Sequence, residues 1–142
     1  MKISIGSDHA GYALKTNIIK YLENQRISVF DCGCFSEDRA DYPDYGHAVA
    51  ENVISGDSDY GIIICGSGNG INMAANKHTG IRSALCWNTE IARLAKEHND
   101  ANIIALPARF ISVDDAEKCI DVFIKSKFEG GRHAERIKKI NC

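Results

Sequence analysis

The sequence has no apolar run long enough to cross a membrane and no large excess of charge of either sign. None of its apolar stretches approaches the roughly 20 residues that a membrane-spanning helix needs. The formal net charge of −2 gives no electrostatic footprint for nucleic acid. Residues 1–6 read as a strand and lack the apolar segment and cleavage site of a signal peptide. We therefore expect a cytoplasmic protein that binds neither membranes nor nucleic acid.

The length and composition predict one globular domain over residues 1–142. A chain of 142 residues is long enough for one well-buried core and too short for two ordinary domains. The hydrophobic fraction of 44% and the charged fraction of 25% are typical of globular proteins. Six cysteines lie in or beside apolar runs, which favours reduced thiols over a disulfide framework. They are Cys32, Cys34, Cys65, Cys86, Cys119 and Cys142.

Strand-like and helix-like segments alternate along the whole chain. The predicted strands cover residues 2–7, 27–32, 59–65, 82–86 and 102–106. The predicted helices cover residues 10–25, 45–54, 72–77, 89–98 and 113–125, and a last helix begins near residue 130. Strict alternation predicts an α/β protein with a three-layer Rossmann-like fold, a five-stranded parallel sheet and helices on both faces. Ligands of such folds bind beyond the carboxyl ends of the strands.

A glycine-rich loop follows the third predicted strand. Residues 62–64 are three consecutive isoleucines, typical of a strand that is buried on both faces, and Cys65 ends that strand. Gly66, Gly68 and Gly70 then let the backbone turn its N–H groups toward a ligand above the strand. A helix-like run follows the loop, so the segment is a candidate oxyanion or phosphate cradle. This position favours the thiolate of Cys65, which suits a nucleophile or a base.

Several familiar motifs do not fit this loop. Its G-x-G-x-G spacing after the third strand, with no suitable acidic residue at the end of the next strand, disfavours a dinucleotide site. The Gly-Lys-Ser/Thr ending of a P-loop is missing. Ser67 has glycine on both sides, unlike the serine of a G-x-S-x-G elbow. Cys32 and Cys34 have no partner pair at zinc-ligand spacing, so we predict no metal site there.

Other polar residues surround the loop in the predicted topology. Asp8 and His9 follow the first strand and Arg109 follows the fifth, which places them at the carboxyl edge of the sheet. His98 and Asn99 end a helix before the fifth strand, so periodicity does not place them at that edge.

The last helix carries two arginines one turn apart, Arg132 and Arg136. They suit bidentate phosphate binding, or equally a solvated helix face with ion pairs to Glu129 and Glu135. We expect His47 and His78 to be solvent-facing helix residues.

Seven short motifs occur in order and cover nearly the whole chain. They are residues 6–11 (GSDHAG), 41–43 (DYP), 65–70 (CGSGNG), 74–77 (AANK), 80–82 (GIR), 98–102 (HNDAN) and 129–133 (EGGRH). Together they resemble the B-type ribose-5-phosphate isomerases. The resemblance implies reversible conversion of D-ribose 5-phosphate to D-ribulose 5-phosphate through an enediolate, in the non-oxidative pentose phosphate pathway. It also implies no metal and no organic cofactor.

The resemblance implies a role for each matching residue. Cys65 matches the general base, which Ser67 helps to orient. Family members without this cysteine carry a glutamate just after the loop, where this chain has Ile71. His98 matches the acid that opens the sugar ring, with Asp8 nearby. The enediolate oxygens would be held by Asn99 and by backbone N–H groups of Gly66, Ser67, Gly68, Asn69 and Gly70.

The remaining matches are substrate contacts, and the resemblance implies an assembly. The substrate and its phosphate would contact Asp8, His9, Tyr42, Arg109, Arg132 and Arg136, with Tyr42 at the pocket wall. B-type enzymes are homodimers or dimers of dimers whose sites are completed across the interface. The helix from about residue 130 would then reach the partner subunit.

Three alternatives stay open at this point. Within the family, the substrate is a six-carbon sugar phosphate such as allose 6-phosphate. In another class, Cys65 and His98 serve a cysteine hydrolase or acyltransferase, which needs a covalent intermediate. The third alternative is a phosphosugar-binding module that binds without turnover.

Overall fold

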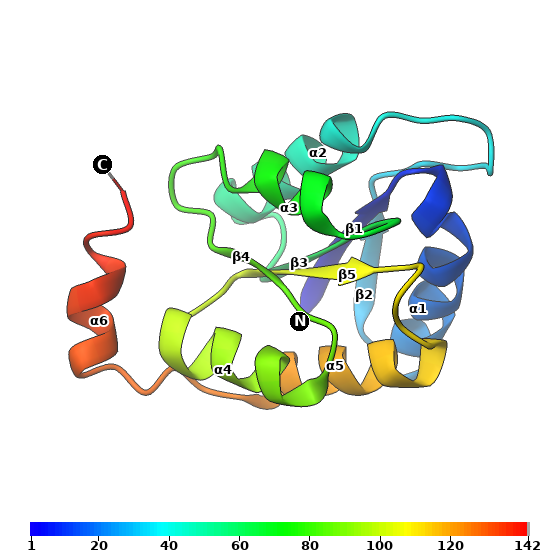
Figure 1. The fold of residues 1–142 in the computed structure, drawn as a ribbon. Helices are drawn as coiled ribbons and strands as arrows, with labels where there is room; N and C mark the ends of the chain where they lie inside the picture. The colour runs from blue at the N-terminus through cyan, green and yellow to red at the C-terminus, as the bar shows by residue number, and fades with distance from the viewer. Residues whose placement is uncertain (142) are drawn as a thin grey trace.

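A five-stranded, all-parallel sheet lies at the centre of the computed structural model, which describes residues 1–141 (Figure 1). The strand order is β2-β1-β3-β5-β4, so the strand before the glycine loop lies in the middle. The predicted α/β fold is confirmed. The strands are β1 (Lys2–Ser7), β2 (Ser28–Asp31), β3 (Tyr60–Cys65), β4 (Ser83–Leu85) and β5 (Ile103–Pro107).

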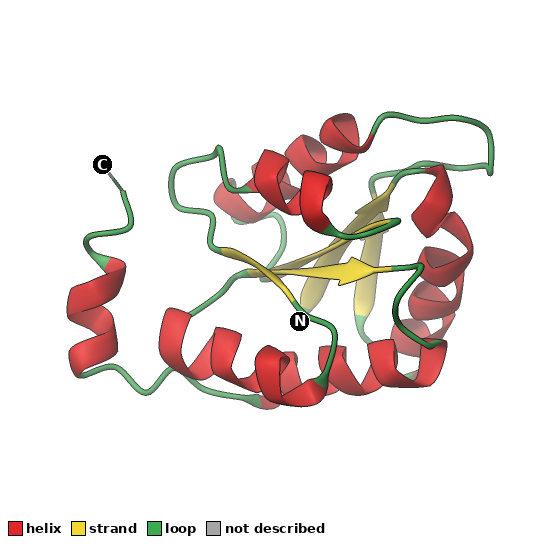
Figure 2. Cartoon of the chain, in the orientation of Figure 1, coloured by secondary structure: helices red, strands yellow, loops and turns green. Residues whose placement is uncertain are grey.

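Helices cover both faces of the sheet, as Figure 2 shows in red on either side of the yellow strands. One face carries α1 (Tyr12–Asn24), α4 (Thr89–Asn99) and α5 (Val113–Lys125). The other face carries α2 (Tyr42–Ile54) and α3 (Asn69–Ala75). The last helix, α6 (Arg132–Ile137), packs against α4 at the end of the molecule, and η1 (His9–Gly11) is a short 3-10 turn.

The central strand explains the isoleucine run in the sequence. Ile62 and Ile64 pack into the core beneath α1, α4 and α5, whereas Ile63 packs beneath α2 and α3. All three are at most 1% exposed. Because alternate side chains of a strand point to opposite faces, a strand between two helical layers needs apolar residues at every position.

Two helices begin three residues earlier than the sequence predicts, whereas α1 begins two residues later, at Tyr12. The helix expected from residue 45 begins at Tyr42, because Asp41 is extended at the N-cap position and Pro43 fits the first turn. The helix expected from residue 72 begins at Asn69, directly after Gly68. Both predictions are wrong by three residues, and the second places Gly70 inside a helix rather than in the loop.

Side-chain caps fix two other helices where the sequence predicts them. Asn88 Oδ1 accepts from the Ile91 N–H (2.9 Å), which begins α4 at Thr89. Ser112 Oγ accepts from the Asp115 N–H (3.1 Å), which begins α5 at Val113. Each cap satisfies a backbone donor that has no partner within the helix.

The described cysteines agree with the prediction of reduced thiols. Cys32, Cys34, Cys65, Cys86 and Cys119 are free. Cys142 lies outside the described residues. Over residues 1–141, no helix combines the length and the apolar character that crossing a membrane requires.

Candidate active site

A cavity of about 480 Å³ opens beyond the carboxyl ends of β1, β3 and β5. These three strands are neighbours in the sheet, so the residues that follow them meet at one place. The site residues predicted from sequence that line the cavity are Asp8, His9, Tyr42, Cys65, Gly66, Ser67, Gly70 and Arg109. Phe110 and Ala10 complete the lining, and the sequence analysis did not single them out.

Cys65 is the last residue of β3 and is only 4% exposed. Its carbonyl accepts from the Ala108 N–H (2.9 Å), and the Gly66 carbonyl accepts from the Arg109 N–H (3.0 Å). These two hydrogen bonds tie the loop after β3 to the loop after β5. The thiol and a guanidinium are thereby placed in one cavity.

The close contact between Gly66 and Arg109 places a positive charge over the glycine loop. A Cβ built on Gly66 would lie 3.1 Å from Arg109 Cζ, so the guanidinium packs directly on the backbone. Arginine is well suited to phosphate and carboxylate groups because its fork of N–H donors matches their oxygens. This side of the cavity therefore suits an anionic group.

Gly68 has the conformation that turns the chain from β3 into α3. Its φ of +76° lies in the left-handed region that disfavours any residue with a Cβ. The Asn69 N–H donates to Ser67 Oγ (3.3 Å), which fixes the serine beside Cys65. The predicted cradle is therefore a short loop over Gly66, Ser67 and Gly68 rather than a loop extending to Gly70.

Asp8 and His9 are held by the backbone around them. Asp8 is buried, and its Oδ1 accepts from the Gly11 N–H (3.1 Å). His9 Nδ1 lies 3.2 Å from both the nitrogen and the oxygen of Ala40. The ring of His9 is thus fixed against the connection between β2 and α2.

Six of the predicted site residues do not line the cavity: Gly68 and Asn69 belong to the turn from β3 into α3, and the other four lie elsewhere. His98 and Asn99 end α4, and Arg132 and Arg136 lie on α6, beyond the amino ends of the strands (Figure 1). Asn99 instead lines a second cavity of about 530 Å³. That cavity also contacts the segment after α3 and Ile140. One chain therefore divides the predicted site residues between two edges of the sheet.

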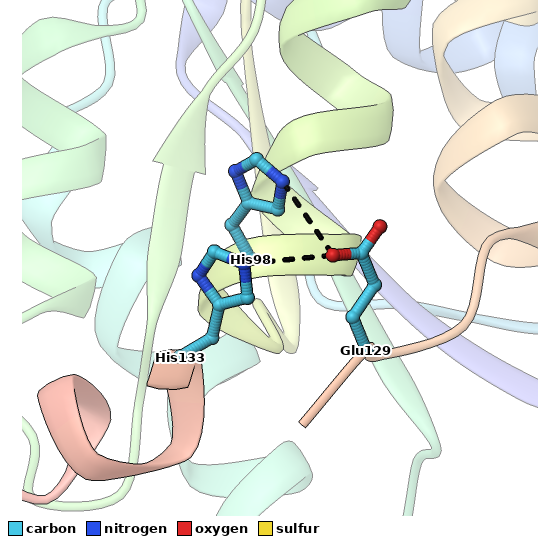
Figure 3. A group of neighbouring side chains, drawn as sticks. All are labelled: His98, Glu129 and His133. Atoms are coloured by element: carbon cyan, nitrogen blue, oxygen red, sulfur yellow. Dashed lines mark ion pairs between the residues drawn. The ribbon is translucent and has the colours of Figure 1, made fainter. Parts of the chain in front are cut away.

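His98 has neighbours that sequence analysis did not predict. Its ring stacks on that of His133, with centroids 4.2 Å apart and an angle of 11° between the planes. Glu129 Oε2 lies 3.8 Å from His98 Nε2 and 3.5 Å from His133 Nε2, as Figure 3 shows. The sequence offered one sign of this contact: Glu129 and His133 are four residues apart. Burial lowers the pKa of His133, and the charges of His98 and Arg132 lower it further.

The two arginines of α6 are exposed and do not form the ion pairs that the sequence allowed. Glu129 faces His98 and His133, and Glu135 pairs with Lys138 (2.9 Å). Among residues 1–141, neither Arg132 nor Arg136 has a carboxylate within 4.0 Å. Both guanidinium groups are therefore available to an anion.

Arg82 holds the end of α4, a role that the sequence analysis missed. Its Nε donates to the carbonyls of Asn99 and Asp100 (3.0 Å each). Its Nη2 donates to the carbonyl (2.8 Å) and the carboxylate (3.1 Å) of Asp100. Asp100 has a φ of +45°, so this clamp secures a turn that most residues disfavour. Asn99 and His98 precede that turn directly.

His47 and His78 are not solvent-facing helix residues, and that prediction is wrong. His47 Nδ1 lies 2.8 Å from His78 Nε2, and both side chains are half-buried. His78 lies in the turn after α3, which ends at Ala75. The two residues are 31 positions apart, so no local pattern reveals their contact.

Comparisons with known proteins agree over nearly the whole chain. Residues 3–140 match the family model described as Ribose/Galactose Isomerase. Ribose-5-phosphate isomerase B of Escherichia coli (strain K12) is 41% identical over 141 residues, which cover 99% of this chain and 95% of that protein. A putative sugar phosphate isomerase of Rickettsia bellii is 46% identical over 138 residues, covering 97% and 96%.

Solved structures show the same similarity. The ribose-5-phosphate isomerase B of Clostridium thermocellum superposes with a TM-score of 0.98 at 51% identity, covering 99% of this chain and 95% of that chain. The ribose-5-phosphate isomerase B of Mycoplasma genitalium, solved with bound ribulose-5-phosphate, gives a TM-score of 0.93 at 42% identity, covering 98% and 93%.

Proposed function

This chain belongs to the ribose/galactose isomerase family, and from that membership we propose that it interconverts D-ribose 5-phosphate and D-ribulose 5-phosphate. It is an aldose–ketose isomerase of the non-oxidative pentose phosphate pathway. The observation that carries the assignment to this chain's own residues is the position of Cys65. It ends the central strand in a cavity that also holds a glycine loop and Arg109.

The reaction moves a proton between two neighbouring carbons. Cys65 takes the proton from C2 of the open aldose, which leaves an enediolate with negative charge on oxygen. Return of that proton to C1 and transfer of the hydroxyl proton from O2 to O1 give the ketose. A well-placed base contributes about 10²–10⁴-fold to the rate. Backbone N–H groups of the loop after β3 stabilise the oxygens, and each good donor contributes ~3–4 kcal/mol.

Arg109 and His9, which both line the cavity, bind the phosphate. Arg109 lies over Gly66, and His9 is fixed by its contact with the Ala40 backbone. Binding energy from the phosphate, which does not react, holds the sugar in place for proton transfer. The substrate is therefore a phosphorylated sugar rather than a free one.

A second copy of the chain completes the site. His98, Asn99, Arg132 and Arg136 lie at the opposite edge from Cys65, so they serve the cavity of a partner subunit in a homodimer or a dimer of dimers. Two exposed aromatic side chains support this assembly: Phe110, which lines the cavity, is 74% exposed, and Phe35 is 73% exposed. Exposed apolar side chains of this size are typical of protein interfaces. The proposed location is the cytoplasm, where phosphorylated sugars are retained by their charge.

Proton exchange in deuterated water tests the function directly. Wild-type protein and Cys65→Ala are incubated with ribose 5-phosphate and followed by NMR. The wild type should form ribulose 5-phosphate and incorporate deuterium at C2 of ribose 5-phosphate, and the variant should lose both. If the wild type neither exchanges nor isomerises, the pentose assignment fails and allose 6-phosphate is the next substrate to test. An active Cys65→Ala variant would assign the base to another residue.

Mass spectrometry separates the isomerase from a cysteine hydrolase. A proton-transferring Cys65 forms no covalent bond to substrate, whereas a hydrolase forms an adduct on its nucleophile. The protein mixed with substrate and quenched in acid should therefore keep its unmodified mass. Binding of ribose 5-phosphate without turnover would instead identify a binding module.

A further inference from the structure

Three side chains near the end of α4 form a group that the cavity around Cys65 does not use. His98 lies in the last turn of α4, Glu129 in the segment before α6, and His133 on α6 (Figure 3). Their ligand atoms all lie within 4.8 Å of one another. Within residues 1–141, this is the one group of three or more histidine, cysteine or acidic side chains at that spacing.

The spacing in this cluster suits a shared metal ion better than hydrogen bonds. Glu129 Oε2 lies 3.5 Å from His133 Nε2 and 3.8 Å from His98 Nε2. Both distances exceed the range of about 2.7–3.2 Å for an N–H···O hydrogen bond. Two ligands of a tetrahedral zinc ion, each about 2.0–2.1 Å from it, lie about 3.4 Å apart. The distances from Glu129 to the two rings are therefore close to those between ligands of one ion.

Backbone and packing contacts hold the cluster in place. The Glu129 N–H donates to the Glu97 carbonyl (3.0 Å), next to His98 in the chain. His133 is buried, and it is the residue that α6 buries against the rest of the molecule. The stacked rings are nearly parallel, so one must turn before both nitrogen lone pairs converge on an ion. The His98 side chain is 36% exposed and that of His133 only 9%, so His98 is the ring less constrained by packing.

The chemistry of the three side chains determines which kind of ion they bind best. Two imidazoles and one carboxylate are ligands of zinc sites that keep a fourth position open. Mg²⁺ and Ca²⁺ prefer sets made of oxygen atoms. The carboxylate of Glu129 favours a cation here, whereas Arg132 and Arg136 oppose it. An ion that forms strong bonds to nitrogen is therefore needed.

We propose that His98, Glu129 and His133 bind one divalent transition-metal ion, for which Zn²⁺ is the best fit. The bound ion occupies the His98 nitrogen, so His98 no longer opens the sugar ring. The ion acts as an inhibitor and not as a cofactor. The inhibitory effect rests on the proposed function, but the metal site does not.

Calorimetric titration of the full chain with Zn²⁺ tests the site without measuring activity. The wild type should bind one equivalent at this cluster. Glu129→Gln removes a ligand on an exposed side chain and should weaken binding at least about tenfold, since even loss of an outer partner of a ligand has such an effect. Glu135→Gln removes the same charge nearby and should bind like the wild type. Unchanged affinity in Glu129→Gln, or loss of binding in Cys65→Ala, would overturn the site.

A pair of activity measurements tests the inhibition. Added Zn²⁺ should slow conversion of cyclic ribose 5-phosphate. It should leave exchange of the C1 proton of ribulose 5-phosphate with deuterated water nearly unchanged, because the open ketose needs no ring opening. Adding Zn²⁺ should not change the rate at which the Glu129→Gln variant converts ribose 5-phosphate.

The outcomes separate the metal site from the enzyme's function. Equal inhibition of both reactions would place the ion at Cys65 and overturn the assignment to His98. Binding of Zn²⁺ with no effect on ribose 5-phosphate conversion would overturn the inhibitory role. The zinc-free rate in the same samples tests the isomerase function by itself.

Discussion

The two edges of the sheet are built in different ways. At the carboxyl edge, the ends of three neighbouring strands meet, and backbone hydrogen bonds such as Arg109 N–H to the Gly66 carbonyl (3.0 Å) fix the cavity. At the amino edge, side chains from α4 and α6 contact one another, and Arg132 and Arg136 stay exposed. The first region follows from sheet topology, whereas the second depends on long side chains at helix ends.

This difference bears on how a complete site forms. The cavity around Cys65 is preorganised within one chain, so the base and the loop need no partner to reach their positions. The amino edge carries His98 and two exposed guanidinium groups, but they lie away from any thiol in the cavity of the same chain. We therefore expect each edge to be inactive without the opposite edge of a second copy.

Mixing two inactive variants should give the largest effect. Cys65→Ala and His98→Asn should each lower kcat/KM by about 10²–10⁴-fold, because each removes a proton-transfer group. In a twofold dimer with sites shared between subunits, a mixed dimer has one intact site and one doubly defective site. Equal mixing after subunit exchange should restore about a quarter of the wild-type activity. Activity no higher than that of the separate variants would place both residues in the same chain's site.

Gly70→Ala should damage the carboxyl edge without unfolding the protein. A Cβ at this position would lie 2.6 Å from Tyr42 Cζ, so the half-exposed ring must move. Alanine within a helix is itself favoured by about 0.5–1 kcal/mol over glycine, which offsets the cost. We expect kcat/KM to fall roughly 10- to 100-fold with little change in Tm. If Tyr42→Ala alone has the same effect and the double variant is no worse, the ring is the affected group.

Arg82→Ala should loosen the amino edge and have a smaller effect on catalysis. It removes four hydrogen bonds to Asn99 and Asp100 and should lower the free energy of unfolding by about 1–3 kcal/mol. The turn after His98 would then be less well held, so kcat/KM should fall about three- to tenfold. Urea unfolding and steady-state kinetics measure the two effects. Arg93→Ala, which breaks an exposed pair with Glu90 and a part-buried pair with Glu97 within α4, is the matched control and should change stability by about 1 kcal/mol or less.

Lowering the pH should slightly destabilise the amino edge and should affect the stability of the carboxyl edge less. Burial lowers the pKa of His133 in the folded chain below its ordinary value of about 6.5. The unfolded chain therefore binds more protons near that pH, so stability is complete above it and falls as the pH drops toward the folded pKa. Hydrogen exchange in α6 should accelerate as the pH falls below about 6.5, after correction for the intrinsic rate. His133→Asn should flatten this response, and an unchanged response would assign it to another group.

Much of the fold and about half of the candidate site were predictable from sequence because their signals are local. Three consecutive isoleucines identified β3, and the glycines after Cys65 identified the loop. The helices from residues 89 and 113 begin where the sequence predicts, because the Asn88 and Ser112 side chains cap them directly. The position of the carboxyl-edge residues then followed from the rule that parallel strands end at one edge.

The amino edge was not predictable because its contacts join distant parts of the chain. The stacking of His98 on His133 depends on how α6 docks on α4, and the clamp of Arg82 on Asp100 joins the start of β4 to the end of α4. The start of α3 was placed too late because Gly70 was assigned to the loop. In the structure, Gly70 belongs to the helix and makes room for the Tyr42 ring.

The strand order also determines when the cavity can exist during folding. β3 pairs with β1 and β5, and every parallel pair requires a crossover through a helix, so few early contacts are local. Such topologies fold more slowly than those rich in local contacts. Arg109 follows β5, which is the last of the five strands in the sequence. A chain still emerging from the ribosome therefore lacks the anion-binding wall until more than two thirds of it has been made, and protection by bound substrate begins only after that point.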